Sequence, residues 1–106
     1  MSAYQRTKGH GWERQTVRDA EAAGLEARRN YQTGAKDVEA DVTIKGRNGI
    51  VYDVEIKKGQ APPMAPAFKQ AIERCGKGHD PVARVTQDGL GFDVAIISWD
   101  LFLSLI

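Results

Sequence analysis

Asp41, Glu55 and Lys57 have the residue types and the spacing that metal-assisted chemistry on a phosphate group requires. If Asp41 and Glu55 lie opposite each other on neighbouring strands, their Cβ atoms are about 4.5–5.5 Å apart and the two carboxylates repel each other. A hard divalent cation reverses that repulsion, because Mg²⁺ binds one or two carboxylates together with phosphate and water. Lys57 is two residues beyond Glu55, so a strand projects its ammonium group from the same face. Such a group orients water or neutralises charge that develops on phosphorus, as hydrolysis of a phosphodiester requires.

A β-hairpin would create this arrangement. Polar and apolar residues alternate from residue 40 to residue 57 on both sides of the turn sequence Gly46-Arg47-Asn48-Gly49. A three-residue loop that ends in a left-handed Gly49 sets the pairing of the two strands. The opposed pairs are then Val42 with Val54, Ile44 with Tyr52, Asp41 with Glu55, and Thr43 with Asp53. A slip of one residue would pair apolar with polar positions, so the alternation favours this register. Asp37 is an alternative to Asp41, but its spacing from Glu55 does not suit the hairpin.

Glu13 is a further candidate, and it lies in a predicted helix from about His10 to Ala23 with Gly24 as a left-handed cap. Val17 and Ala20 follow Glu13 at i+4 and i+7, so all three lie on the stripe that faces the body of the protein. A carboxylate in that position is costly to bury without a partner. Glu13 is therefore suited to hold metal-bound water or a second ion.

The remaining pattern predicts a single α/β domain over residues 1–106, with helices around a mixed central β-sheet. Residues 1–9 are polar and are expected to form a flexible arm. The other expected elements are a strand that begins near 25–27, a helix over 67–75 with Phe68, Ile72 and Cys75 inward, strands over 82–85 and 92–97, and a C-terminal helix capped by Ser98.

The composition favours a folded intracellular protein. Of 106 residues, 42% are hydrophobic and 27% charged, which is typical of a globular domain. The longest apolar run, 94–97, is far too short for a membrane span, and the N-terminus has no signal-peptide pattern. A single cysteine, Cys75, fits a reducing compartment, so we expect a cytoplasmic protein. All 15 basic residues lie within residues 1–84, whereas the acidic residues continue to Asp100, which is compatible with a polyanion on one face.

Several short segments resemble one known family when they are taken together. In chain order they are Gly9-His10-Gly11-Trp12-Glu13-Arg14, Gly24-Leu25-Glu26-Ala27-Arg28-Arg29, Thr33-Gly34, Asp41-Val42 and Val54-Glu55-Ile56-Lys57. This series resembles the archaeal and phage-type Holliday junction resolvases of the PD-(D/E)xK nuclease superfamily over about residues 8–58. Two positions depart from the family pattern. Thr33 stands where a serine is usual, and Ala40 replaces the proline that precedes the aspartate.

The resemblance implies a restriction-endonuclease-like fold and a Mg²⁺-dependent endonuclease, with Mn²⁺ as a possible substitute. It also implies a homodimer that acts on four-way DNA junctions and leaves a 5′-phosphate, inside a cell or a phage-infected host. The implied catalytic residues are Glu13, Asp41, Glu55, Lys57 and Thr33. The implied metal ligands are Asp41, Glu55 and the backbone carbonyl of Ile56, with Glu13 acting through water or a second ion. No small-molecule cofactor and no membrane partner are expected.

Basic residues near these motifs are candidate contacts to DNA. They are Lys8, His10, Arg14, Arg28, Arg29, Lys36, Arg47 and Lys58. The apolar segment 99–106 and the strand over 92–97 are the expected dimer surface, with Phe102 and Leu105 as contributors. Two alternatives stay open: a restriction, nicking or repair nuclease of the same superfamily, and a catalytically silent nucleic-acid-binding module of the same fold.

Overall fold

The structure is a computed structural model that describes residues 3–30, 40–89 and 91–106, with side chains from residue 11 onward. The described residues form three helices and a five-stranded sheet. In chain order the elements are α1 (Ala3–Ala22), β1 (Glu26–Arg29), β2 (Val42–Lys45), β3 (Val51–Gly59), α2 (Met64–Glu73), β4 (Asp80–Gln87), β5 (Asp93–Ile96) and α3 (Trp99–Leu105). The predicted α/β class with a mixed sheet and flanking helices is therefore confirmed.

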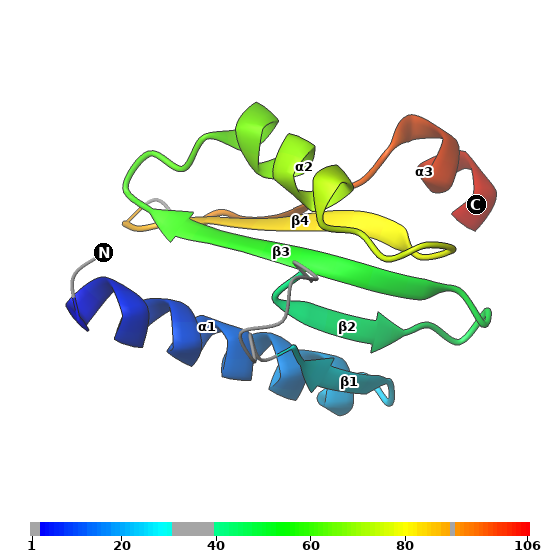
Figure 1. Ribbon diagram of the computed structural model, residues 1–106, viewed down its shortest axis with the longest axis horizontal. Helices are drawn as coiled ribbons and strands as arrows, with labels where there is room; N and C mark the ends of the chain where they lie inside the picture. The colour runs from blue at the N-terminus through cyan, green and yellow to red at the C-terminus, as the bar shows by residue number, and fades with distance from the viewer. Residues whose placement is uncertain (1–2, 31–39, 90) are drawn as a thin grey trace.

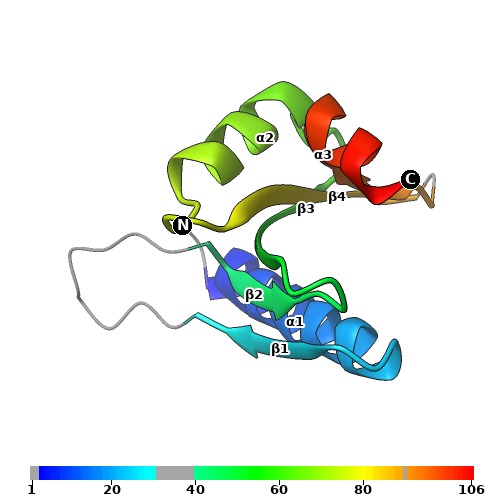
Figure 2. The same ribbon diagram turned by 90° about the vertical axis from the view of Figure 1, so that its right-hand side faces the viewer.

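The strands lie in the order β1-β2-β3-β4-β5, and each neighbouring pair is antiparallel except β3 and β4. Parallel strands need a crossover connection, and α2 provides it between β3 and β4. α1 lies along one face of the sheet, and α2 and α3 lie along the other (Figures 1 and 2). β3 is thus the central strand, with β2 as its antiparallel neighbour and β4 as its parallel neighbour. Helices lie on both sides of the sheet.

The β2–β3 hairpin has the predicted register. Val42 pairs with Val54, and Ile44 pairs with Tyr52. Gly49 has a φ of +83°, the left-handed conformation that the three-residue loop requires. The hairpin therefore fixes which residues of β3 face the candidate site.

α2 packs on the sheet through small residues rather than through the large residues that the sequence pattern favoured. Ala67 and Ala71 are fully buried against Ala83 and Val85 of β4, and Phe68 packs beside them. Ile72, which was predicted to face inward, is 53% exposed, and the helix ends at Glu73, before Cys75. The inward prediction is confirmed for Phe68, which packs on the core, but it was wrong for Ile72. Alanines at i and i+4 let the helix approach the sheet closely, and Ile72 lies outside that stripe.

α1 begins at Ala3, so the expected polar arm is helical from residue 3 to residue 9. Helix-forming residues at positions 3–8 extend the helix, and a glycine within it costs only about 1 kcal/mol. At the other end of the chain, the prediction for Ser98 is confirmed, because its Oγ accepts a hydrogen bond from the amide of Leu101 at 3.0 Å. No helix in the described parts of the chain is long and apolar enough to cross a membrane.

Candidate active site

Two carboxyl groups meet where β2 begins beside the middle of β3. Asp41 directly precedes β2, and its Oδ2 accepts a hydrogen bond from the backbone amide of Ile56 at 2.9 Å. Glu55 lies on β3 with only 1% of its surface exposed, and its carboxyl group is hydrogen-bonded to that of Asp41. The hairpin thus brings together the two acids that the sequence predicted to be opposed.

The environment of Glu55 strongly disfavours a second negative charge. Burial, and then the hydrogen bond and the charge of Asp41, raise the pKa of Glu55 to about 8, whereas Arg74 and Lys57 oppose this change. A proton held between the two carboxyl groups relieves their repulsion in the absence of a stronger cation. A divalent ion would relieve it better, because it replaces one proton with two positive charges.

Arg74 is a site residue that the sequence reasoning missed. It is the C-cap of α2, and its Nη1 donates to Oε1 of Glu55 at 3.0 Å and to Oε2 at 3.2 Å. Its sequence distance of 19 residues from Glu55 places it outside the motif region. The one usable signal was energetic: a buried carboxylate needs a cationic or hydrogen-bonding partner, and the helix that follows its strand is a natural source.

Glu13 reaches the same region from α1 on the other layer of the fold. Its side chain is half-buried, and burial followed by the charge of Asp41 raises its pKa, while Arg29 and Arg14 lower it. The influence of Asp41 shows that Glu13 lies within its electrostatic field. Glu13 thus interacts electrostatically with Asp41, and Asp41 with Glu55; these three residues are called the acidic cluster below.

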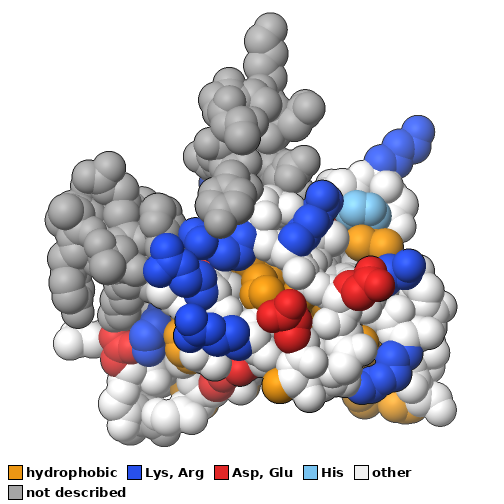
Figure 3. All heavy atoms as spheres, turned by 90° about the horizontal axis from the view of Figure 1, so that it is seen from below, with side chains coloured by type: hydrophobic (Ala, Val, Ile, Leu, Met, Phe, Trp, Pro, Cys, Tyr) orange, Lys and Arg blue, Asp and Glu red, His pale blue; other side chains and the backbone are white. Residues whose placement is uncertain are grey.

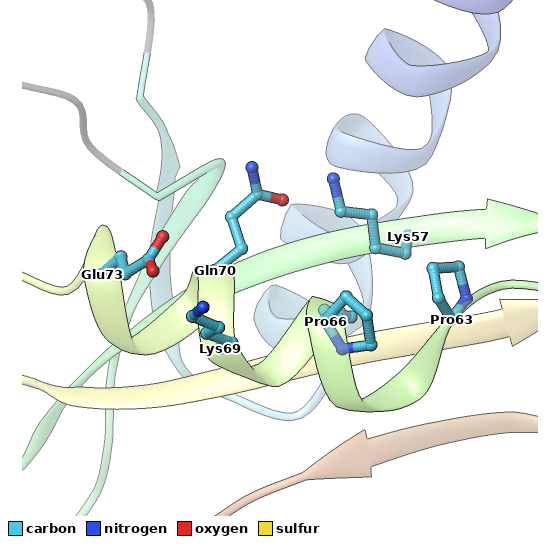
Figure 4. A pocket seen from close by; sticks show the side chains of 7 residues that line it. Lys57, Pro63, Pro66, Lys69, Gln70 and Glu73 are labelled. Carbon is cyan, nitrogen blue, oxygen red and sulfur yellow. The ribbon is translucent and has the colours of Figure 1, made fainter.

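Lys57 opens onto a cavity of about 360 Å³ between β3 and α2. The cavity is lined by Lys57, Pro63, Pro66, Ala67, Lys69, Gln70 and Glu73. In Figure 4 the Lys57 ammonium group and the Gln70 amide extend in the same direction, one from the strand and one from the helix. This size is at the lower end of the range for ligand sites, and of the proposed catalytic residues only Lys57 is among its lining residues.

Asp53 precedes Glu55 on the same face of β3, yet its pKa is shifted in the opposite direction. Its carboxylate accepts hydrogen bonds from Thr43 Oγ1 at 2.7 Å, from the Gly76 amide at 2.7 Å and from His79 Nδ1 at 2.9 Å. Although burial alone would raise the pKa of Asp53, these hydrogen bonds lower it overall. Asp53 is therefore an ionised structural acid that joins β2, β3 and the turn after α2.

The predicted DNA contacts divide into several groups. Arg14 and Arg28 are exposed, on α1 and β1. Lys58 forms an ion pair with Asp88 at 2.9 Å, and its Nζ lies 4.9 Å from the centre of the Trp12 ring. Figure 3 views the face that α1 covers, where Lys and Arg side chains gather near the middle with carboxylates among them. The side chains of Lys8 and His10, and the whole of Thr33, Lys36 and the rival Asp37, lie outside the described parts of the structure.

Arg47 lies away from the acidic cluster. It occupies the β2–β3 turn and donates to the backbone carbonyl of Ala23, so it ties the turn to the end of α1. Asp41 is at the other end of β2, roughly 15 Å away at the usual rise of a strand. This placement favours a structural role for Arg47 over contact with a phosphate at the site.

Asp41 and Glu55 fit a Mg²⁺ site by the chemistry of their donors. Within the described residues there is no group of three or more His, Cys, Asp or Glu side chains arranged to hold a metal. Mg²⁺ does not need such a group, because it commonly binds one or two carboxylates and completes its shell with water and substrate phosphate. Of Ile56, only the amide is seen in contact with Asp41, so its carbonyl remains a predicted ligand.

Comparison of the chain with protein-family models, with curated proteins and with solved structures finds no significant match.

Proposed function

We propose that this protein is a Mg²⁺-dependent DNA endonuclease of the PD-(D/E)xK kind, acting on four-way junctions. The observation that supports this most directly is the pair of adjoining carboxyl groups of Asp41 and Glu55, one of them fully buried, with Lys57 two residues along the same strand face. A mixed sheet with helices on both faces is compatible with the restriction-endonuclease-like fold that the sequence resemblance implies.

In this proposal Asp41 and Glu55 hold the divalent cation. When bound, that cation polarises the phosphate and makes a water molecule acidic enough to act as nucleophile. Lys57 lines the cavity, and its ammonium group would neutralise charge that develops on the phosphate oxygens. Glu13, on α1 and in electrostatic interaction with Asp41, would orient water on that side. Thr33 remains a predicted partner for water or phosphate.

The choice of a junction as substrate rests on the sequence resemblance and on the need for two symmetric cuts. The described residues hold one such pair of acids, so paired cuts call for two copies of the chain. α3 offers an apolar surface for a second copy, because Trp99, Phe102, Leu103, Leu105 and Ile106 are each at least 41% exposed. That end of the chain has no basic residue after Arg84, which suits protein contact better than DNA contact.

Cleavage of a synthetic four-way junction beside a linear duplex of matched sequence tests the proposal, with Mg²⁺ and with EDTA. The wild-type protein should cut the junction only with Mg²⁺, and Asp41→Asn should lose cleavage but still bind the junction in Ca²⁺. Glu21→Gln, at an exposed acid near the end of α1 and outside the proposed dimer surface, is the control for the change of charge. Equal cutting of junction and duplex would mean a nuclease of another specificity. Absence of Mg²⁺-dependent cutting on any DNA, or an active Asp41→Asn, would refute the assignment.

A further inference from the structure

The hydrogen bonds of the two acids in this structure engage carboxylate oxygens that a metal ion would use. Arg74 Nη1 lies within 3.2 Å of both oxygens of Glu55, and Asp41 Oδ2 is already bonded to the Ile56 amide. A cation needs carboxylate oxygens with free lone pairs facing it. The guanidinium of Arg74 thus occupies the approach to Glu55 that a divalent ion would use.

Arg74 also lies where its side chain can move away from Glu55. It is the C-cap of α2 with a non-helical ψ of 0°, and its side chain is 28% exposed while that of Glu55 is 1% exposed. The guanidinium therefore reaches Glu55 from the solvent side, at the end of a helix rather than within it. Phosphate is a good alternative partner, because the planar fork of an arginine binds phosphate oxygens with two parallel hydrogen bonds.

We propose that Arg74 is the resident cation of the metal-free site, that it competes with the divalent ion for Glu55, and that it passes to a DNA phosphate when the ion binds. This inference rests on the proposed function, since it requires Asp41 and Glu55 to be metal ligands. It adds a coupling: any phosphate that draws Arg74 away from Glu55 strengthens metal binding, and by reciprocity bound metal strengthens phosphate binding. The free protein then holds metal weakly, and the complete site forms on DNA.

The charges around Glu55 give the direction of the effect. Asp41 attracts a cation, whereas Arg74 and Lys57 repel it. Removing the guanidinium takes away one repelling charge and the two hydrogen bonds that it donates to the Glu55 oxygens. A purely structural role for Arg74 predicts the opposite, because a displaced or misoriented Glu55 would bind metal less well.

The test is the affinity of Mn²⁺ for the DNA-free protein, measured by electron paramagnetic resonance or calorimetry. Arg74→Gln should bind Mn²⁺ roughly tenfold more tightly than wild type, corresponding to about 1.4 kcal/mol. Arg74→Lys, which keeps the charge but loses the fork, should bind with an affinity between the two. Arg18→Gln removes the same charge from an exposed position on α1 and should bind like wild type. A non-cleavable junction should tighten Mn²⁺ binding in wild type more than in Arg74→Gln.

Equal or weaker Mn²⁺ binding by Arg74→Gln would overturn the inference. If that variant does not fold, Arg74→Lys decides instead, and an affinity equal to or below that of wild type refutes the competition. Glu55→Gln separates this failure from failure of the proposed function. Wild-type binding that Glu55→Gln abolishes keeps the metal site even when Arg74 proves irrelevant, whereas binding that survives Glu55→Gln refutes both.

Discussion

Replacing Glu55 with glutamine is expected to stabilise the metal-free protein at neutral pH, although it removes a proposed metal ligand. The pKa of Glu55 is raised from 4.5 to about 8 in the folded chain, mainly by burial and then by Asp41. Between these two values the folded state keeps a proton that the unfolded state has lost, so unfolding becomes easier as the pH rises. Glutamine has the shape of the protonated acid, and its amide can donate to Asp41 as that proton does.

The size of the effect follows from the pKa change. One proton of difference changes the free energy of unfolding by about 1.4 kcal/mol per pH unit. Glu55 should therefore cost the wild-type protein roughly 2–3 kcal/mol between pH 5 and pH 7, a cost that Glu55→Gln avoids. This figure is an upper bound, because Glu55 is coupled to Asp41 and the pair shares the titration.

Urea unfolding in EDTA at pH 5, 6, 7 and 8 measures this difference directly. The wild-type free energy of unfolding should fall with pH more steeply than that of Glu55→Gln, and the exposed Glu21→Gln control should follow wild type. Mn²⁺ at pH 8 should stabilise wild type but not Glu55→Gln, since a ligand that binds only the folded state adds to stability. Parallel pH profiles for wild type and Glu55→Gln would show that Glu55 has an ordinary pKa, and the reasoning would fail.

Three further outcomes are expected. Lys57→Met should lower the single-turnover cleavage rate by a factor of about a hundred or more and leave the junction affinity in Ca²⁺ unchanged. A defect confined to junction binding would mean that Lys57 has no part in the chemistry. Asp53→Asn should lower the free energy of unfolding by roughly 1–3 kcal/mol at pH 7, because one of its three hydrogen-bond donors is left without an acceptor. The difference should shrink below about pH 4, since the lowered pKa of Asp53 contributes stability only above that range, and it is measured by urea unfolding. Light scattering should give the wild-type protein a mass near twice 11.7 kDa. Phe102→Asp should have the mass of one chain and an unchanged circular dichroism spectrum. A monomeric wild-type protein that makes paired cuts would contradict the dimer.

The hairpin and its two acids were predictable because local rules agree there. The alternation of side chains, the turn sequence and the left-handed Gly49 all specify one register, and that register alone opposes Asp41 to Glu55. The class of the fold followed from the order of the elements for the same reason.

Local sequence patterns did not predict the positions of three side chains, those of Arg74, Ile72 and Arg47. Arg74 reaches Glu55 only because α2 crosses back over β3, and the packing of α2 on β4 that fixes its placement joins residues far apart in the sequence. Ile72 was assigned to the interior by its hydrophobicity, but close packing through Ala67 and Ala71 turned it outward. Arg47 is near the motif in sequence, and it is the length of β2 that moves it away from the acids.

The central position of β3 has a consequence for when activity appears as the chain folds. The acids and Arg74 come from the start of β2, the middle of β3 and the end of α2, and β3 pairs in parallel only with β4, which is made after the crossover. Such non-local pairing forms late, because a long loop must close before the contacts are gained. A nascent or partly folded chain therefore holds the hairpin without Arg74 beside Glu55 and without the cavity at Lys57. Under the proposed function, cutting activity should therefore appear only once the sheet is complete.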